Sequence, residues 1–272
     1  MNTGKQLRLR RIFRGERSII VPMDHALYFG PIEQLADPAT LVRRVASKGA
    51  DGILVPPGTL TTLPPDALGD LAVLLRLDGT CSRMGHNLAQ TSLITSVEEA
   101  VRLGVDGVVV NIYVGSENED YLLGKLGTVA EQCRNWGMVL IGEMIPAPLL
   151  TAHYGHGDAN LCPEERAEAI GVAARIGAEI GVDVLKINYS GSRDSFREVT
   201  RHAQRPALVA GGVQAGSEKE FLADIRDCLD GGAAGVCIGR NLWARDDMES
   251  MLEALRLLVH EDAPLEKALS AL

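Results

Sequence analysis

The chain has 272 residues, of which 46% are hydrophobic and 23% charged, and its formal net charge is −9. This composition is too apolar for a disordered chain, and the length allows one large domain or two small ones. The negative charge argues against a nucleic-acid partner, because phosphate backbones are bound by clustered Lys and Arg. No apolar run approaches the ~20 residues of a membrane helix, and the five cysteines form no C-x-x-C pair, which is typical of reduced thiols in a cytoplasmic protein.

The first 17 residues are strongly basic and precede the first apolar run. That run is too short for the core of a signal peptide, and Asp24 interrupts it. We therefore expect a short N-terminal helix that closes one end of the domain or pairs with an acidic neighbouring subunit. Its basic residues are Lys5, Arg8, Arg10, Arg11, Arg14 and Arg17.

Short runs rich in Val and Ile then alternate along the chain with amphipathic stretches of helical length. Asp37-Pro38, Ser96–Glu99, Cys162–Glu165 and Ser217–Glu220 have the residue types that begin helices. Several helices end at a Gly that leads into the next apolar run through a similar phrase, as in Gly104-Val-Asp-Gly-Val108. The eight runs predicted as strands are Ser18–Met23, Gly52–Val55, Ala72–Leu77, Gly107–Ile112, Met138–Met144, Val182–Ile187, Ala207–Ala210 and Gly235–Ile238.

Continuous apolar strands are typical of parallel sheets that are covered on both faces. Eight of them alternating with helices predict an α/β protein with a single (β/α)8 barrel over residues 1–272, of which 1–17 form the basic N-terminal extension. A doubly wound open sheet has the same alternation and is the alternative. No Pro- or Ser-rich linker divides the chain into two domains.

The sixth strand carries Lys186 between apolar neighbours, close to the strand's C-terminal end. A (β/α)8 barrel builds its active site at this end of its strands. Burial disfavours the ammonium, so we expect a lowered pKa and a nucleophilic amine. A structural ion pair between Lys186 and a barrel carboxylate is the alternative.

Other polar residues follow neighbouring strands. Asp24, after the first strand, could transfer protons or orient Lys186, or it could cap the following loop. The loop after the fifth strand contains Tyr154, whose hydroxyl could act as an acid or base, or whose ring could pack on the barrel rim.

The seventh and eighth strands end in glycines. Gly211 and Gly212 follow the seventh, and Gly239 with Arg240 follows the eighth. Glycines let backbone N–H groups approach an anion, and Arg240 adds a fixed charge, so these positions predict a phosphate site. Tight turns with a surface Arg are the alternative.

With these residues in view, nearly the whole sequence resembles the archaeal-type class I aldolases. This group includes fructose-bisphosphate aldolases, 2-amino-3,7-dideoxy-D-threo-hept-6-ulosonate synthases, and aldolases that join dihydroxyacetone phosphate to aspartate semialdehyde. The resemblance is carried by Met23-Asp-His25, Gly30-Pro-Ile-Glu33, Thr95-Ser-Val-Glu-Glu-Ala100, Leu185-Lys-Ile-Asn-Tyr-Ser190, Ala210-Gly-Gly212, Gly232-Ala-Ala-Gly-Val236, Gly239-Arg-Asn241 and Val259-His-Glu261.

The resemblance implies a Schiff base on Lys186, proton transfer by Asp24 and Tyr154, and no cofactor. The expected substrates are a phosphorylated ketose and an aldehyde. It also implies a homo-oligomer. Binding of substrate or phosphate falls on His25, Ser190, Gly211, Gly212, Gly239 and Arg240.

The sequence departs from the family in one loop. Relatives commonly carry Tyr-Pro-Arg-Gly after the fifth strand, whereas this chain has His153-Tyr154-Gly155-His156-Gly157. The missing Pro and Arg concern the assignment of Tyr154 and the contacts expected to the aldehyde substrate or to a second phosphate. Gly30-Pro-Ile-Glu33 favours a synthase-like branch over a fructose-bisphosphate aldolase.

Three other functions remain as alternatives. His153, His156 and Asp158, with His25 and His86, could form a metal site of a metal-dependent aldolase or hydrolase, although their spacing is loose and we expect no metal. The same lysine could serve a thiolase-like transfer on a phosphorylated ketose. A barrel that binds phosphosugars without catalysis is the third.

Overall fold

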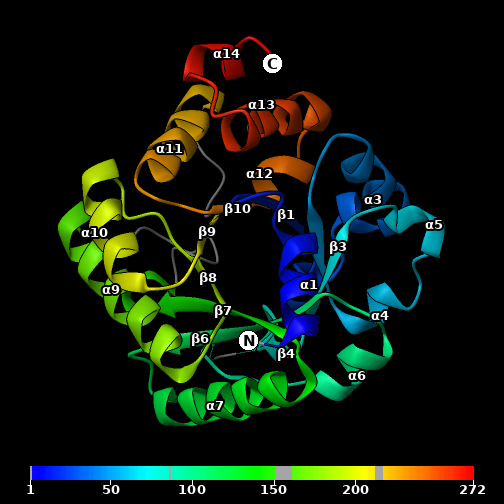
Figure 1. The fold of residues 1–272 in the computed structure, drawn as a ribbon, viewed down its shortest axis with the longest axis vertical. Helices are drawn as coiled ribbons and strands as arrows, with labels where there is room; N and C mark the ends of the chain where they lie inside the picture. The colour runs from blue at the N-terminus through cyan, green and yellow to red at the C-terminus, as the bar shows by residue number, and fades with distance from the viewer. Residues whose placement is uncertain (1, 86, 88, 151–160, 212–216) are drawn as a thin grey trace.

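The computed structural model describes residues 2–85, 87, 89–150, 161–211 and 217–272. Eight parallel strands pair side by side into a closed barrel, and helices form a ring around it (Figure 1). The barrel is closed because the first strand pairs with both the second and the last. This arrangement confirms the predicted (β/α)8 barrel and excludes the open sheet. In order around the barrel, the strands are β1 (Ser18–Pro22), β10 (Gly235–Cys237), β9 (Ala207–Ala210), β8 (Val184–Ile187), β7 (Val139–Pro146), β6 (Gly107–Val114), β3 (Ala72–Arg76) and β2 (Gly52–Val55).

The strands agree with the eight predicted runs to within two residues at each end. β6 and β7 extend furthest beyond prediction, because they pair continuously from Gly107 with Val139 to Val114 with Pro146. Pro146 can end this pairing because its nitrogen has no hydrogen to donate.

Helices follow the strands, and their first residues are capped as expected. The side chains of Asp37, Ser96 and Ser217 accept hydrogen bonds from backbone N–H groups three residues later. No helix in the described part of the chain is long and apolar enough to span a membrane. The helices are α1 (Thr3–Ile12), α2 (Ala26–Phe29), α3 (Pro38–Ser47), α4 (Pro57–Leu60), α5 (Pro65–Leu68), α6 (Val97–Arg102), α7 (Glu119–Trp136), α9 (Pro163–Ile180), α10 (Arg193–Ala203), α11 (Glu218–Asp230), α12 (Arg240–Trp243), α13 (Met248–His260) and α14 (Leu265–Leu269).

A small antiparallel hairpin after β3 was not predicted. It joins β4 (Asp78–Thr80) to β5 (Thr91–Leu93). Three-residue strands are too short for a periodic pattern, so the sequence carries little signal for them.

The basic helix α1 lies across one end of the barrel (Figure 1). Three aspartates at the starts of strands each accept a hydrogen bond from the backbone N–H of a neighbouring strand, at Ile19, Val73 or Leu140. The same aspartates pair with basic residues of the N-terminal segment, so the helix closes the barrel against the chain's own carboxylates. The pairs are Lys5 with Asp183 at 2.7 Å, Arg11 with Asp106 at 3.3 Å, and Arg14 with Asp51 at 3.4 Å.

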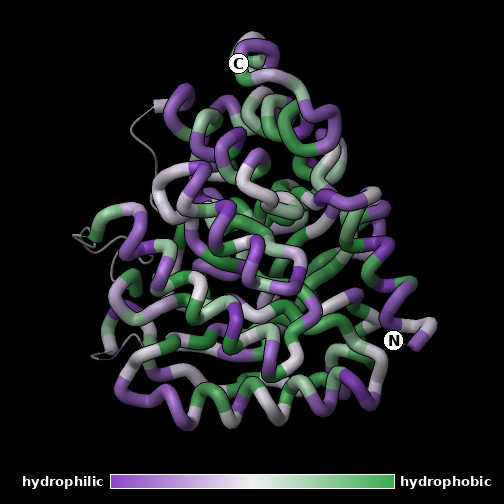
Figure 2. The backbone as a smooth tube through the Cα atoms, turned by 60° about the vertical axis from the view of Figure 1, so that its left-hand side comes forward, coloured by the Kyte–Doolittle hydropathy of each residue, from purple (hydrophilic) through white to green (hydrophobic). Residues whose placement is uncertain are grey.

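The barrel interior changes from apolar to polar along the strands. Near α1, the buried Ile12 packs with inward-facing apolar side chains such as Leu74, Ile141 and Val184. Side chains alternate between the two faces of a strand, so the next inward position lies two residues further along. On β3, β6, β7 and β8 that position is Arg76, Asn111, Glu143 and Lys186 respectively. A larger apolar cluster fills the space between the strands and the surrounding helices. Figure 2 shows hydrophobic and hydrophilic residues alternating along much of the backbone.

Candidate active site

A pocket opens where the polar layer reaches the C-terminal ends of the strands. It contains an amine, two carboxylates, a guanidinium from the barrel interior and a second guanidinium at the rim. Its lining residues are Pro22, Asp24, His25, Tyr28, Phe29, Arg76, Asn111, Glu143, Lys186, Ala210, Gly211, Cys237, Gly239 and Arg240.

Lys186 lies at the floor of this pocket and pairs with Glu143. The two residues are direct neighbours in the register of β7 and β8, and Lys186 Nζ lies 2.6 Å from Glu143 Oε1. Lys186 is 6% exposed and Glu143 is 2% exposed. The lysine therefore has both features considered from sequence: it lies in the pocket, and it forms an ion pair with a barrel carboxylate.

The pKa of Lys186 is raised, so the lowering expected from the sequence is wrong. Burial by itself lowers it, but the anionic side chains around the amine, among them the Glu143 and Asp24 carboxylates, raise it and outweigh burial. Burial also raises the pKa of the Cys237 thiol to about 12, which leaves Glu143 as the anionic partner at neutral pH. Lys186 thus starts as an ammonium.

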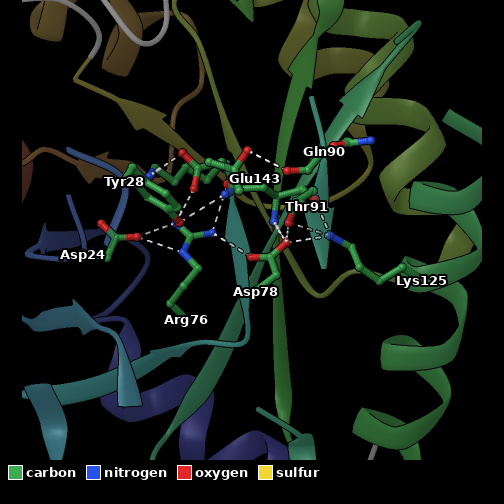
Figure 3. A network of polar contacts seen from close by, with 11 residues as sticks. Asp24, Tyr28, Arg76, Asp78, Gln90, Thr91, Lys125 and Glu143 are labelled. Carbon is green, nitrogen blue, oxygen red and sulfur yellow. Dashed lines mark hydrogen bonds and ion pairs between the residues drawn. The ribbon is translucent and has the colours of Figure 1, made fainter. Parts of the chain in front are cut away.

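Arg76 connects the acidic residues of the pocket (Figure 3). Its Nε donates to Asp24 Oδ2 at 2.8 Å, its Nη1 to Asn111 Oδ1 at 3.0 Å, and its Nη2 to Glu143 Oε2 at 2.5 Å. All four side chains are buried. The expected contact between a carboxylate and Lys186 exists, but Glu143 makes it, while Asp24 is bonded to Arg76.

A second buried ion pair joins the hairpin to the barrel. Asp78 Oδ2 accepts hydrogen bonds from Lys125 Nζ at 2.6 Å, from Thr91 Oγ1 at 2.9 Å and from the Asn111 backbone at 2.8 Å (Figure 3). Burial lowers the pKa of Lys125, although Asp78 acts against this. This cluster fixes β4 and β5 beside the pocket.

Three of the four predicted phosphate residues line the same pocket. Gly211, Gly239 and Arg240 all do so, whereas Gly212 lies outside the described residues. Gly239 has no room for a side chain, since a Cβ there would lie 2.8 Å from the Pro22 carbonyl oxygen. The close approach of β10's end to β1 therefore requires glycine, and it places Arg240 at the pocket.

His25 lies beside Arg240 as a neutral imidazole. Burial lowers its pKa to about 4; Asp24 opposes this shift, while Arg240 and Lys186 add to it. Its ring makes an edge contact with Trp243, whose Nε1 donates to the Pro22 carbonyl. His25 is thus held in the pocket as a neutral group beside a cation.

Ser190 is not among the residues that line the described pocket. Ser190 is buried, and its hydroxyl shares a hydrogen bond with Ser195 at 2.7 Å, away from the lining residues. Tyr154 lies outside the described residues. Tyr28 provides a phenol that was not predicted; its hydroxyl accepts from Asn111, and burial raises its pKa well above the usual value.

Sequence reasoning missed Arg76, Asn111 and Glu143. A signal for them was present: each is a polar residue near the C-terminal end of an otherwise apolar strand, as Lys186 is. Charged residues are rarely buried without partners, so Arg76, Glu143 and Lys186 on separate barrel strands predict mutual contact.

The metal alternative includes four residues besides His25. His86, His153, His156 and Asp158 lie outside the described part of the chain. Within the residues that are described, no group of three His, Cys, Asp or Glu side chains could hold a metal ion.

Comparison with known proteins agrees with the fold. Residues 18–245 match the model of the DeoC/LacD family of aldolases. The chain belongs to this family. Among the aldolase's relatives, the 2-amino-3,7-dideoxy-D-threo-hept-6-ulosonate synthase of Halobacterium salinarum is 35% identical over 269 residues, which cover 99% of this chain and 96% of that protein. The 2-amino-4,5-dihydroxy-6-oxo-7-(phosphonooxy)heptanoate synthase of Streptomyces griseus is 32% identical over 259 residues, covering 94% and 90%.

A solved structure connects the aldolase fold to imine chemistry. It is that of an archaeal fructose 1,6-bisphosphate aldolase with the catalytic lysine covalently bound to the carbinolamine intermediate. Its TM-score is 0.81 at 28% identity, covering 94% of this chain and 99% of that one. The expected class of enzyme is therefore confirmed: the chain is a Schiff-base aldolase.

Proposed function

We propose that this aldolase forms a Schiff base between Lys186 and a phosphorylated ketose of the dihydroxyacetone phosphate type. The observation that carries the proposal is the position of Lys186: it is buried at the C-terminal end of β8, 2.6 Å from a carboxylate, in one pocket with Gly239 and Arg240. An amine and a phosphate-binding rim in the same pocket suit a phosphorylated ketone.

In the proposed reaction, Lys186 attacks the ketone carbon and the carbinolamine loses water. The resulting iminium accepts electrons while the carbon–carbon bond forms or breaks. Gly211, Gly212, Gly239 and Arg240 hold the phosphate, which keeps the donor in register with the amine. We assign proton transfer at the reacting carbons to Asp24 and Tyr154, and contacts to the substrate to His25 and Ser190.

We further propose that the acceptor is aspartate semialdehyde. Breaking a 2-amino-4,5-dihydroxy-6-oxo-7-(phosphonooxy)heptanoate between carbons 4 and 5 gives dihydroxyacetone phosphate and aspartate semialdehyde, and the Streptomyces griseus relative is named for synthesis of this compound. Gly30-Pro-Ile-Glu33 also supports a synthase-like branch.

Cleavage of fructose 1,6-bisphosphate is the second candidate. The similarity to the archaeal fructose 1,6-bisphosphate aldolase favours it. In that case glyceraldehyde 3-phosphate replaces aspartate semialdehyde as the acceptor, while the chemistry at Lys186 stays the same.

The proposal is tested by borohydride reduction in the presence of dihydroxyacetone phosphate, followed by peptide mass spectrometry. We expect a stable adduct on Lys186 and no adduct or turnover in a folded Lys186→Ala variant. Turnover of Lys186→Ala within a few-fold of the parent would contradict the proposal. Acceptors are then compared by their kcat/KM, with aspartate semialdehyde expected to exceed glyceraldehyde 3-phosphate.

We also propose that the enzyme is cytoplasmic, that it is a homo-oligomer, and that residues 1–272 form one domain. The reduced cysteines support the first, since all five are free thiols. The family resemblance supports the second, and light scattering tests it.

A further inference from the structure

We propose that Glu143 is the proton carrier of imine formation, taking a proton from the Lys186 ammonium and returning it to the carbinolamine hydroxyl. The inference rests on the proposed Schiff base at Lys186 and names the residue that makes its formation fast.

The backbone places Glu143 for this role. Lys186 and Glu143 face each other across adjacent strands, so their side chains enter the barrel at the same level. The contact between Nζ and Oε1 is 2.6 Å, within reach of direct proton transfer. Both residues are almost fully buried, so bulk water has poor access to the amine.

The chemistry requires a proton acceptor at this position. Lys186 begins as an ammonium because its pKa is raised, and an ammonium has no lone pair with which to attack a ketone. Asp24 and Glu143 are the carboxylates that line the described pocket, and Asp24 accepts its hydrogen bond from Arg76. Glu143 is the carboxylate in contact with the amine.

Lys186 and Glu143 supply and accept all the protons that imine formation requires. Glu143 takes one proton from Lys186, and the nitrogen lone pair forms the N–C bond while the carbonyl π electrons move to oxygen. A second proton moves from nitrogen to that oxygen and gives the neutral carbinolamine. Glu143 then donates its proton to the hydroxyl, the C–O bond breaks, water leaves, and the nitrogen lone pair forms the iminium. Glu143 ends as a carboxylate beside the new cation.

Arg76 acts as a positioning residue for this transfer. Its Nη2 holds Glu143 Oε2 at 2.5 Å, which leaves Oε1 directed at Lys186. Asp24 remains as a counter-charge for Arg76 while Glu143 is neutral.

The experiment follows exchange of the C2 oxygen of dihydroxyacetone phosphate with ¹⁸O-labelled water, because carbinolamine dehydration replaces that oxygen. It uses the full-length parent, Glu143→Gln and Glu143→Asp, with Asp24→Asn for comparison because Asp24 is the other carboxylate bonded to Arg76. Binding of the donor and the circular dichroism spectrum are measured for each variant.

We expect Glu143→Gln to bind the donor but to exchange its oxygen and accept borohydride on the order of 10² to 10⁴ times more slowly than the parent. Glu143→Asp keeps the carboxylate one methylene further back and should recover part of the rate. Should Glu143→Gln fail to fold, slowed oxygen exchange with intact donor binding in Glu143→Asp would support the same role for Glu143. Asp24→Asn should slow exchange much less than Glu143→Gln.

Exchange at the parent rate in folded Glu143→Gln would overturn the inference, as would a larger loss in Asp24→Asn than in Glu143→Gln. Failure of the underlying function looks different: the parent itself would then show no adduct on Lys186 and no exchange.

Discussion

Arg76 Nε donates a hydrogen bond to Asp24 Oδ2 over 2.8 Å, and the exposed fraction of each side chain is no more than 3%. Asp24 is therefore part of a buried charge network that also contains Glu143 and Lys186. Removing one charged side chain from such a network lowers the free energy of unfolding, because the remaining charges stay buried without a partner of opposite sign.

Substitution of Arg76 tests the network's contribution to stability. Arg76→Met should lower the free energy of unfolding by about 3–5 kcal/mol, because two carboxylates lose their shared counter-charge. Urea denaturation at neutral pH measures the change. Arg102→Met is the control, since Arg102 is 65% exposed in its pairs with Glu98 and Glu99 and should change stability by less than about 1 kcal/mol. Equal effects of the two substitutions would show that the buried network does not stabilise the fold.

The ionisation of Lys186 should depend on Glu143. In the parent, the raised pKa keeps the amine protonated through neutral pH, and its free-base fraction grows only at alkaline pH. Glu143→Gln removes an anion that raises this pKa, while burial and Arg76, which lower it, remain. Acetylation of Lys186 by a small reagent, followed against pH by peptide mass spectrometry, should therefore begin at lower pH in the variant.

The same measurement separates two causes of lost activity. Faster acetylation together with slower imine formation would assign the defect of Glu143→Gln to proton donation, because the amine itself has become more available. Coincident acetylation curves, or a shift to higher pH, would show that Glu143 does not control the amine.

His25 should make the fold sensitive to acid. Its pKa is about 4 in the folded protein and about 6.5 when unfolded, so the unfolded state binds more protons between these values. Stability is therefore complete above pH 6.5 and falls as the pH drops towards 4. The loss between pH 7 and 4.5 is about 2 kcal/mol, since the side chain is still 18% exposed.

His25→Gln removes the titrating group and should lose less stability over the same interval. Urea denaturation of both proteins at pH 7 and 4.5 gives the comparison. An equal loss in the two proteins would assign the acid sensitivity to other groups.

The N-terminal helix should contribute to stability through its packing at the barrel end. Ile12 is fully buried against the apolar interior layer, so Ile12→Ala should cost about 2–5 kcal/mol. Leu7 belongs to the same helix but is 55% exposed, and Leu7→Ala should change stability by less than about 0.5 kcal/mol. Thermal or urea denaturation measures both. A small effect of Ile12→Ala would mean that α1 is not required to close the barrel.

The alternation of strands and helices could be predicted from the sequence, as could the helix caps at Asp37, Ser96 and Ser217 and the position of Lys186 near a strand's C-terminal end. These features are local: they depend on side-chain period, on hydrogen bonds within a few residues, and on the order of elements along the chain. The hairpin after β3 was not predicted, because its three-residue strands are too short to show the side-chain alternation of a strand.

The contacts between polar residues of the pocket could not be predicted from the sequence, because they depend on how the strands assemble. Arg76 and Asp24 are 52 positions apart, and Lys5 and Asp183 are 178 apart. Closure of the barrel sets the strand register, and register decides which side chains share an inward-facing level. That is why Glu143 rather than Asp24 contacts Lys186, and why the amine's pKa rises although burial alone would lower it.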